Sequence, residues 1–278
     1  MDKQEIHRNY EKEFLKIFNG LCYSRSGWQV WADVMCVIAC SISNAADRTE
    51  PRFSDREKEY AACIERIGSV ESPAKLMGIV VDALEDNPEQ DFLGAMYMQL
   101  NLGDHWKGQF FTPYHVCKLM SDISIGVGVK DEVKKKGYIS INDPTCGAGA
   151  TLIAGVNTLR KFGINYQRHA IFIGQDLDRV VAMMCYIQLS LLGCAGYVVV
   201  ANTITNPHCG SALKPIEKEG QEFWYMPMFA TDIWRYRIAF NSIEQLIGNT
   251  KGEIRKKDRY TYFFDFKEGE NDEREKCS

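Results

Sequence analysis

The first hundred residues carry apolar side chains at three- and four-residue steps, the spacing of an amphipathic helix. Two such series are Ile6, Tyr10, Phe14, Ile17 and Leu21, and then Trp28, Trp31, Met35, Ile38 and Ile42. Ser54-Asp55 and Ser72-Pro73 are typical helix starts, so we expect a third helix through Ile67 and a fourth through about Leu84. With a fifth expected over 92–100, residues 1–106 are predicted to form an all-helical N-terminal domain.

From residue 107 the pattern changes to short apolar runs that alternate with helical segments. Strands are expected at 138–141, 170–173 and 197–200, with helices at 150–162 and 180–192 between them. This alternation predicts an α/β domain with a parallel, Rossmann-like sheet over 107–250. Such sheets bind ligands beyond the carboxyl ends of their strands.

The last third of the chain gives a weaker pattern. We expect a loop at 210–222, two strands of a hairpin or sheet edge at 223–229 and 234–240, and a charged C-terminal tail at 251–278. Trp234, Arg235, Tyr236 and Arg237 alternate aromatic and basic side chains, which is typical of a DNA contact and equally of a half-exposed strand. Both interpretations stay open.

Composition narrows the class of protein. The net charge of -4 excludes an overall basic field, so any contact with nucleic acid must come from a local patch. The ten cysteines form no CxxC pair, so we expect no metal site. Cys36 and Cys40 lie in an apolar helical stretch, where we expect their thiols to be part of the core. This use of cysteine favours a reducing, cytoplasmic setting. Because the sequence starts with polar and charged residues, we expect no signal peptide. No apolar run is long enough for a membrane span, so none is expected.

The segment most informative for chemistry runs from Asn142 to Ala150. It follows a strand and precedes a helix, and Gly147 and Gly149 permit a tight turn whose amides favour an anionic group of a ligand. Asp143 can accept from an ammonium group, and Asp176, after the second strand, can hold ribose hydroxyls. Dinucleotide-binding proteins share the strand, turn and helix, but the spacing here is D-P-x-C-G-x-G rather than G-x-G-x-x-G.

Three segments together resemble the adenine-N6 DNA methylases of the type I restriction-modification kind, including shorter phage-borne relatives. They are Gly108-Gln109-Phe110-Phe111-Thr112-Pro113, Asp143-Pro144-Thr145-Cys146-Gly147-Ala148-Gly149, and Gly174-Gln175-Asp176. Their order and spacing, and the helical first half, agree with that family over roughly residues 1–205. The resemblance implies a methyltransferase fold, S-adenosylmethionine (SAM) as cofactor and DNA as substrate.

The resemblance also implies roles for single residues. Phe111, Thr112 and Pro113 would cover SAM, and its amino-acid end would be held by Asp143, Pro144, Cys146, Gly147 and Gly149. Asp176 would take the ribose, Leu177 would flank the adenine and Asn202 would bond to it. Two positions depart from the family: Ala148 replaces a hydroxyl residue, and Asn202 replaces an Asp that accepts from the adenine amine.

The largest departure is the catalytic tetrapeptide [ND]-P-P-[FY], expected after a fourth strand. In the family its polar residue accepts hydrogen bonds from the target amine, and its aromatic ring stacks on the flipped base. The closest match is Asn206-Pro207-His208, which lacks the second proline and lies only four residues after Asn202. A catalytic loop at Asn206 and Pro207 and a simple turn are both open.

Three functions are therefore open for this protein. The first is an active SAM-dependent DNA adenine-N6 methyltransferase, which in this family works with a separate specificity subunit. The second is a catalytically silent homologue that binds SAM or DNA in a complex. The third, a dehydrogenase-like nucleotide enzyme, is disfavoured by the missing G-x-G-x-x-G.

Overall fold

A computed structural model describes the chain except residues 1–2, 24, 103–110, 127, 251–260 and 263–278. The expected domain boundaries at 106/107 and 250/251 adjoin or fall within these gaps, so they stay predictions. In the segment 108–113, which carries the residues expected to cover the cofactor, residues 108–110 lie outside the described residues. Phe111, Thr112 and Pro113 lie within them. The basic residues 255–257, in the expected charged C-terminal tail, also lie outside the described residues.

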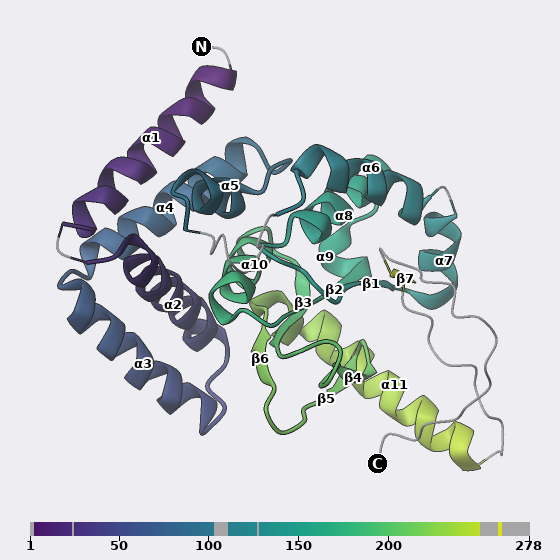
Figure 1. Ribbon diagram of the computed structural model, residues 1–278. Helices are drawn as coiled ribbons and strands as arrows, with labels where there is room; N and C mark the ends of the chain where they lie inside the picture. The colour runs from purple at the N-terminus through teal and green to yellow at the C-terminus, as the bar shows by residue number, and fades with distance from the viewer. Residues whose placement is uncertain (1–2, 24, 103–110, 127, 251–260, 263–278) are drawn as a thin grey trace.

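The first half of the chain is helical, as predicted. It contains α1 (Lys3–Leu21), α2 (Gly27–Ala46), α3 (Arg52–Ile67), α4 (Glu71–Asp86) and α5 (Phe92–Gln99), grouped at the left of Figure 1. Helix α3 starts at Arg52, two residues before the expected start at Ser54-Asp55, so Ser54 lies inside the helix, where its hydroxyl donates to Glu50.

Helix α2 is the apolar centre of this group. By length and composition alone it could cross a membrane, but 72% of its most apolar stretch is buried inside the protein. Trp31, Phe14 and Phe18 meet there with ring centroids 5.5–6.4 Å apart. The helix is therefore the core of a packed bundle.

The second half forms a five-stranded sheet in the order β6-β3-β2-β1-β7. Strands β1 (Ile139–Asp143), β2 (Ala170–Asp176), β3 (Ala195–Val200) and β7 (Thr261–Tyr262) are parallel, and β6 (Glu222–Tyr225) is antiparallel to β3. The α/β class, the three predicted parallel strands and the edge strand near 223 are confirmed. Tyr262 and Thr261 add a fourth parallel strand that the sequence pattern did not predict.

Both faces of the sheet are buried. Phe172 and Val198 face the core shared with α8 (Ala150–Lys161), α10 (Arg179–Leu191) and the N-terminal helices, whereas Ile173 and Val199 face a second core. Further helices are α6 (Tyr114–Ile125), α7 (Val129–Lys136), α9 (Tyr166–His169) and the 3-10 turn η1 (Pro227–Ala230). Burial on both faces explains why these strands are continuous apolar runs rather than alternating ones.

Two expectations for the last third are wrong. Residues 234–240 form part of α11 (Asp232–Thr250), not a strand, because Trp234 and Ile238, one helical turn apart, cover the second face of the sheet. Residues 210–222 are not a plain loop either, since β4 (Cys209–Ser211) and β5 (Lys214–Ile216) pair as a small antiparallel hairpin.

Gly196 gives a test of the close approach between β2 and β3. It has φ +140°, and a Cβ there would overlap the carbonyl oxygen of Phe172. We expect Gly196→Ala to lower the free energy of unfolding by roughly 3 kcal/mol or more, measured by chemical denaturation.

The matched control for this test is Gly68→Ala. Gly68 also has a positive φ, +73°, but nothing lies within 4 Å of an added Cβ. Only the backbone penalty of about 1 kcal/mol is expected there. Equal losses in the two variants would contradict the role given to Gly196.

Candidate functional site

The carboxyl ends of the three central strands meet at one edge of the sheet. β1 ends at Asp143 and β2 ends at Asp176, while Val200, the last residue of β3, pairs with Asp176. The turns that follow these three strands therefore lie together. This is the edge at which parallel α/β sheets bind ligands.

The turn after β1 requires glycine at two positions. Gly147 has φ +55° and Gly149 has φ +98°, and the Gly149 amide donates to the Cys146 carbonyl at 2.8 Å. A Cβ on Gly149 would lie 2.9 Å from the Cys185 sulfur, so α10 packs directly against the turn. The turn is thus packed against α10 at the point where α8 begins.

Asp176 connects the turns after β1 and β2. Its Oδ2 accepts from the Gly147 amide at 2.9 Å, and its Oδ1 accepts from the Asp178 amide at 2.9 Å. Asp143 accepts from the Thr145 amide at 3.0 Å. Each oxygen of the half-buried Asp176 carboxylate has a further lone pair for a ligand.

The two carboxyl groups make this edge favourable for a cation. Burial raises the pKa of Asp143, which is 2% exposed, and the charge of Asp176 raises it further. Desolvation likewise raises the pKa of half-buried Asp176. A positively charged group between them would offset both effects.

Phe111 covers the glycine turn. Its ring lies 3.3 Å from the position of a Cβ on Gly147, and its centroid is 5.4 Å from that of Tyr97 at the end of α5. Thr112 and Pro113 are exposed and lead into α6. Of the three expected covering residues, the structure therefore brings the Phe111 ring against the turn.

The other expected cofactor residues line the same edge. Cys146 is buried and its amide donates to the Gln175 carbonyl, and the Pro144 carbonyl accepts from the Thr203 hydroxyl. Leu177 follows Asp176 and is 68% exposed. It is available to an aromatic ring.

Asn202 lies in the turn after β3. Its Oδ1 accepts from the amides of Ile204 at 2.9 Å and Thr205 at 3.1 Å. The oxygen is thus used within the turn, and the NH2 group is what this side chain has to offer a ligand. Asn202 can therefore donate a hydrogen bond to a ligand.

Asn206 is held by hydrogen bonds on both sides of its amide. Its Nδ2 donates to the Glu219 carbonyl at 3.0 Å, and its Oδ1 accepts from Gln221 at 3.1 Å. Pro207 is exposed beside it, and its carbonyl accepts from Gln221 as well. These contacts give Asn206 a structural role in the turn, while a catalytic role stays a prediction.

The aromatic and basic segment on α11 is divided between core and surface. Trp234 is fully buried and donates to the Gln167 carbonyl, and the Arg237 guanidinium lies 4.7 Å from the Trp234 ring centroid. The Trp234 ring is therefore not accessible to a base. Arg235 and Tyr236 are exposed and remain the two members available to a DNA contact.

Gln188 was missed by sequence reasoning. Its amide donates to Asp91 at 2.8 Å and to the Ala148 carbonyl at 2.9 Å, and its oxygen accepts from the Leu93 amide. It thus connects the glycine turn to the start of α5. The only signal in the sequence is one glutamine in the otherwise apolar stretch Val180–Leu189.

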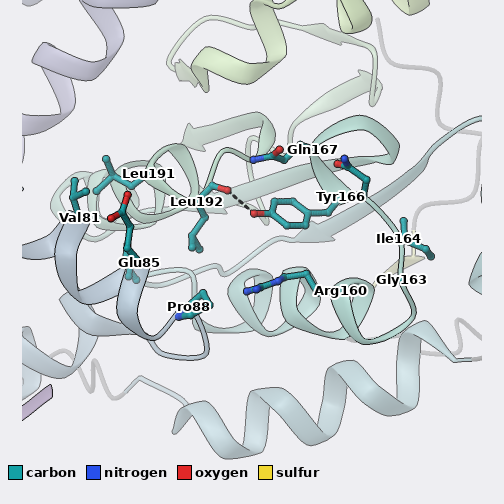
Figure 2. Close-up of a pocket in the computed structure, with 12 residues that line it drawn as sticks. Val81, Glu85, Pro88, Arg160, Gly163, Ile164, Tyr166, Gln167, Leu191 and Leu192 are labelled. Atoms are coloured by element: carbon teal, nitrogen blue, oxygen red, sulfur yellow. Dashed lines mark hydrogen bonds between the residues drawn. The ribbon is translucent and has the colours of Figure 1, made fainter. Parts of the chain in front are cut away.

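A separate cavity of about 610 Å³ lies at the opposite edge of the sheet (Figure 2). It is lined by Leu191 and Leu192 just before β3 and by Tyr166 and Gln167 just before β2, with the Tyr166 hydroxyl donating to the Leu192 carbonyl at 2.7 Å. These residues precede the amino ends of the strands. The cavity is therefore distinct from the edge that carries Asp143 and Asp176.

Comparison with known proteins adds one match. A family model described as N-6 DNA Methylase matches residues 89–234, just over half of the chain. The matched range begins before α5 and includes the glycine turn, the Asp176 segment and the turn after β3. No curated protein matches the chain.

The buried carboxyl group of Asp143 makes the stability of the protein depend on pH. Because the pKa of Asp143 is raised in the folded state, its protonated form stabilises the fold. This contribution to the free energy of unfolding is fully present below about pH 4 and is lost as the pH rises through the raised pKa. We expect Asp143→Asn to unfold with a higher free energy than wild type at pH 7, and this gain to shrink toward pH 4. Asp131→Asn, on exposed α7, should change little at either pH. A less stable Asp143→Asn at pH 7 would contradict the analysis.

Gln175 gives a second prediction. Its buried amide donates to the carbonyls of Ala201 and Asn206 and accepts from the His208 amide. We expect Gln175→Leu to cost about 2 to 3 kcal/mol and to speed hydrogen exchange at the His208 amide, because these groups lose a buried partner.

The control for this variant is Gln221→Leu, which removes a contact to the same Asn206 carbonyl from the partly exposed side. Water can replace that contact, so the cost should stay under about 1 kcal/mol. Similar behaviour of the two variants would show that Gln175 does not organise the turn.

Proposed function

The chain belongs to the N-6 DNA methylase family, because the family model matches more than half of it, and from this premise we propose that it is a SAM-dependent methyltransferase acting on adenine N6 in DNA. The observation that carries the proposal is the pair Asp143 and Asp176 beside a glycine turn covered by Phe111. The dehydrogenase alternative lacks both the family match and the glycine spacing it needs.

The chemistry of the residues fits SAM. The cofactor carries an ammonium and a sulfonium, and the two acids favour positive charge at this edge. Its carboxylate suits the amides at the start of α8, next to Gly147 and Gly149. A neutral or purely anionic ligand would leave the Asp143 and Asp176 charges unbalanced.

The nucleoside end of SAM fits the turns after β2 and β3. The free lone pairs of the Asp176 carboxylate suit the ribose hydroxyls, and exposed Leu177 suits one face of the adenine. Asn202 would donate its NH2 to a ring nitrogen of the adenine. Asn202→Asp is therefore not a conservative change in this site, because it replaces a donor with an acceptor.

SAM supplies the methyl group, and the protein must hold the target amine in line with it. Asn206 and Pro207 are the candidate acceptors for that amine. Asn206 Oδ1 has a second lone pair beside its bond to Gln221, so it can accept without breaking the turn. The residues after β7, 263–266, read Phe-Phe-Asp-Phe and contain no proline pair, so they offer no better match.

DNA as the substrate agrees with the cytoplasmic setting expected from the cysteines. All nine cysteines in the described part of the chain are free thiols. The net charge of -4 leaves DNA attraction to a local patch or to a further subunit. A separate specificity subunit, which related type I systems use, would supply sequence recognition in this proposal.

The first test is SAM binding by calorimetry. Asp176→Ala should weaken SAM binding roughly tenfold to a hundredfold, because hydrogen bonds to a charged acceptor are lost. Asp131→Ala on exposed α7 is the matched control and should bind like wild type, and NADH should not bind. Absence of SAM binding by the wild-type chain at millimolar concentration would overturn the proposal.

Methyl incorporation into DNA tests the chemistry. Asn206→Ala should abolish transfer while leaving SAM affinity unchanged. Gln221→Leu keeps the Asn206 side chain but removes its neighbour, and it should retain activity. Full transfer by Asn206→Ala would exclude Asn206 as the acceptor, and SAM binding without any transfer by the wild type would indicate a silent homologue.

A further inference from the structure

Helices α2 and α3 pack against each other and present two pairs of side chains, each pair one turn apart. Cys36 and Cys40 lie on α2, and Glu59 and Cys63 lie on α3. The three cysteines are at most 3% exposed. All four residues precede the matched range 89–234, so membership of the family does not account for them.

The potential ligand atoms are close together. The sulfurs of Cys36 and Cys40 are 3.9 Å apart, and a carboxylate oxygen of Glu59 lies with both inside a 4.8 Å limit. Cys63 contacts the Cys36 thiol from the facing helix. Two sulfurs and one oxygen therefore lie close together between the two helices, and the Cys63 sulfur adjoins that of Cys36.

These spacings match a tetrahedral zinc site. With Zn–S bonds of about 2.3 Å, tetrahedral geometry puts two sulfurs about 3.8 Å apart. The Cys36 and Cys40 sulfurs already have that separation. A shift of at most about 1.2 Å at Glu59 would bring its oxygen to the corresponding distance, given Zn–O bonds of about 2.0 to 2.2 Å.

Apolar packing alone does not account for the arrangement. A single buried cysteine behaves as a small hydrophobic residue, but here a carboxylate lies beside two thiols. The same carboxylate receives both Arg179 nitrogens, at 2.6 and 2.7 Å, which fixes its direction. Outer partners of this kind orient metal ligands in known sites. Arg66 also donates to the Cys63 sulfur at 3.0 Å.

We propose that Cys36, Cys40 and Glu59 bind one Zn²⁺ ion, with Cys63 as the fourth ligand, and that this ion fixes α2 to α3. The donor set of thiolates and one carboxylate is one that zinc accepts. No water is needed to complete four ligands, so the site is structural rather than catalytic. The proposal departs from the expectation, drawn from the cysteine spacing, that no metal is bound.

The test is the zinc content of the full-length chain, purified in reducing buffer without chelator and, in parallel, refolded with Zn²⁺, since buried ligands are reached during folding. About one equivalent per chain is expected in the refolded sample. Cys36→Ala and Cys40→Ala should each lower the content at least tenfold. Cys22→Ala and Cys194→Ala, which remove thiols elsewhere, should retain it.

Two further measurements separate metal binding from failure to fold. Glu59→Gln preserves the shape of the side chain and should weaken Zn²⁺ affinity at least tenfold with an unchanged helical circular dichroism signal. Refolding with Co²⁺ should give a thiolate-to-cobalt absorption band that Cys40→Ala lacks. Less than about a tenth of an equivalent in the refolded wild type, or an undiminished content in both cysteine variants, would overturn the proposal.

Discussion

Strands β2 and β3 carry apolar side chains on both faces, and the rest of the structure follows from the need to bury both. One face is covered by α8, α10 and the N-terminal helices, and the other by η1 and α11. A sheet enclosed in this way exposes little but the ends of its strands. The polar residues that end β1 and β2 are therefore directed to one edge, where a ligand can reach them.

The N-terminal helices do more than cover the sheet. Gln188 connects the glycine turn to Asp91 and Leu93 at the start of α5, and Tyr97 from α5 packs on Phe111. Arg56 reaches from α3 to the Phe223 carbonyl on β6, and its guanidinium lies 4.0 Å from the Trp224 ring centroid. The candidate cofactor site is thus supported from both halves of the chain. A cofactor that orders this turn would be coupled to the packing of α5.

The candidate site carries electrostatic strain that a ligand can relieve. Asp143 and Asp176 have limited access to water, which raises the pKa of both groups, and the charge of Asp176 raises the pKa of Asp143 further. Their arrangement costs stability in the free protein and favours a cation at the same place. Functional sites commonly retain such unfavourable groups because the bound state compensates for them.

The sequence by itself determined the elements with strong periodicity and the local chemistry of the turns. The helices of the first half, the three central strands and the residues Asp143, Gly147, Gly149 and Asp176 follow from hydrophobic spacing and glycine positions alone. Only the tertiary structure decided what depends on distant contacts. Trp234 to Phe240 alternates like a strand, yet it is helical because the second face of the sheet needs a stripe one turn apart, formed by Trp234 and Ile238. Gln188 meets Asp91 across 97 positions, and Cys36 and Cys40 meet Glu59 from another helix. Such pairs have no fixed spacing along the chain, because packing between elements rather than local geometry brings them together.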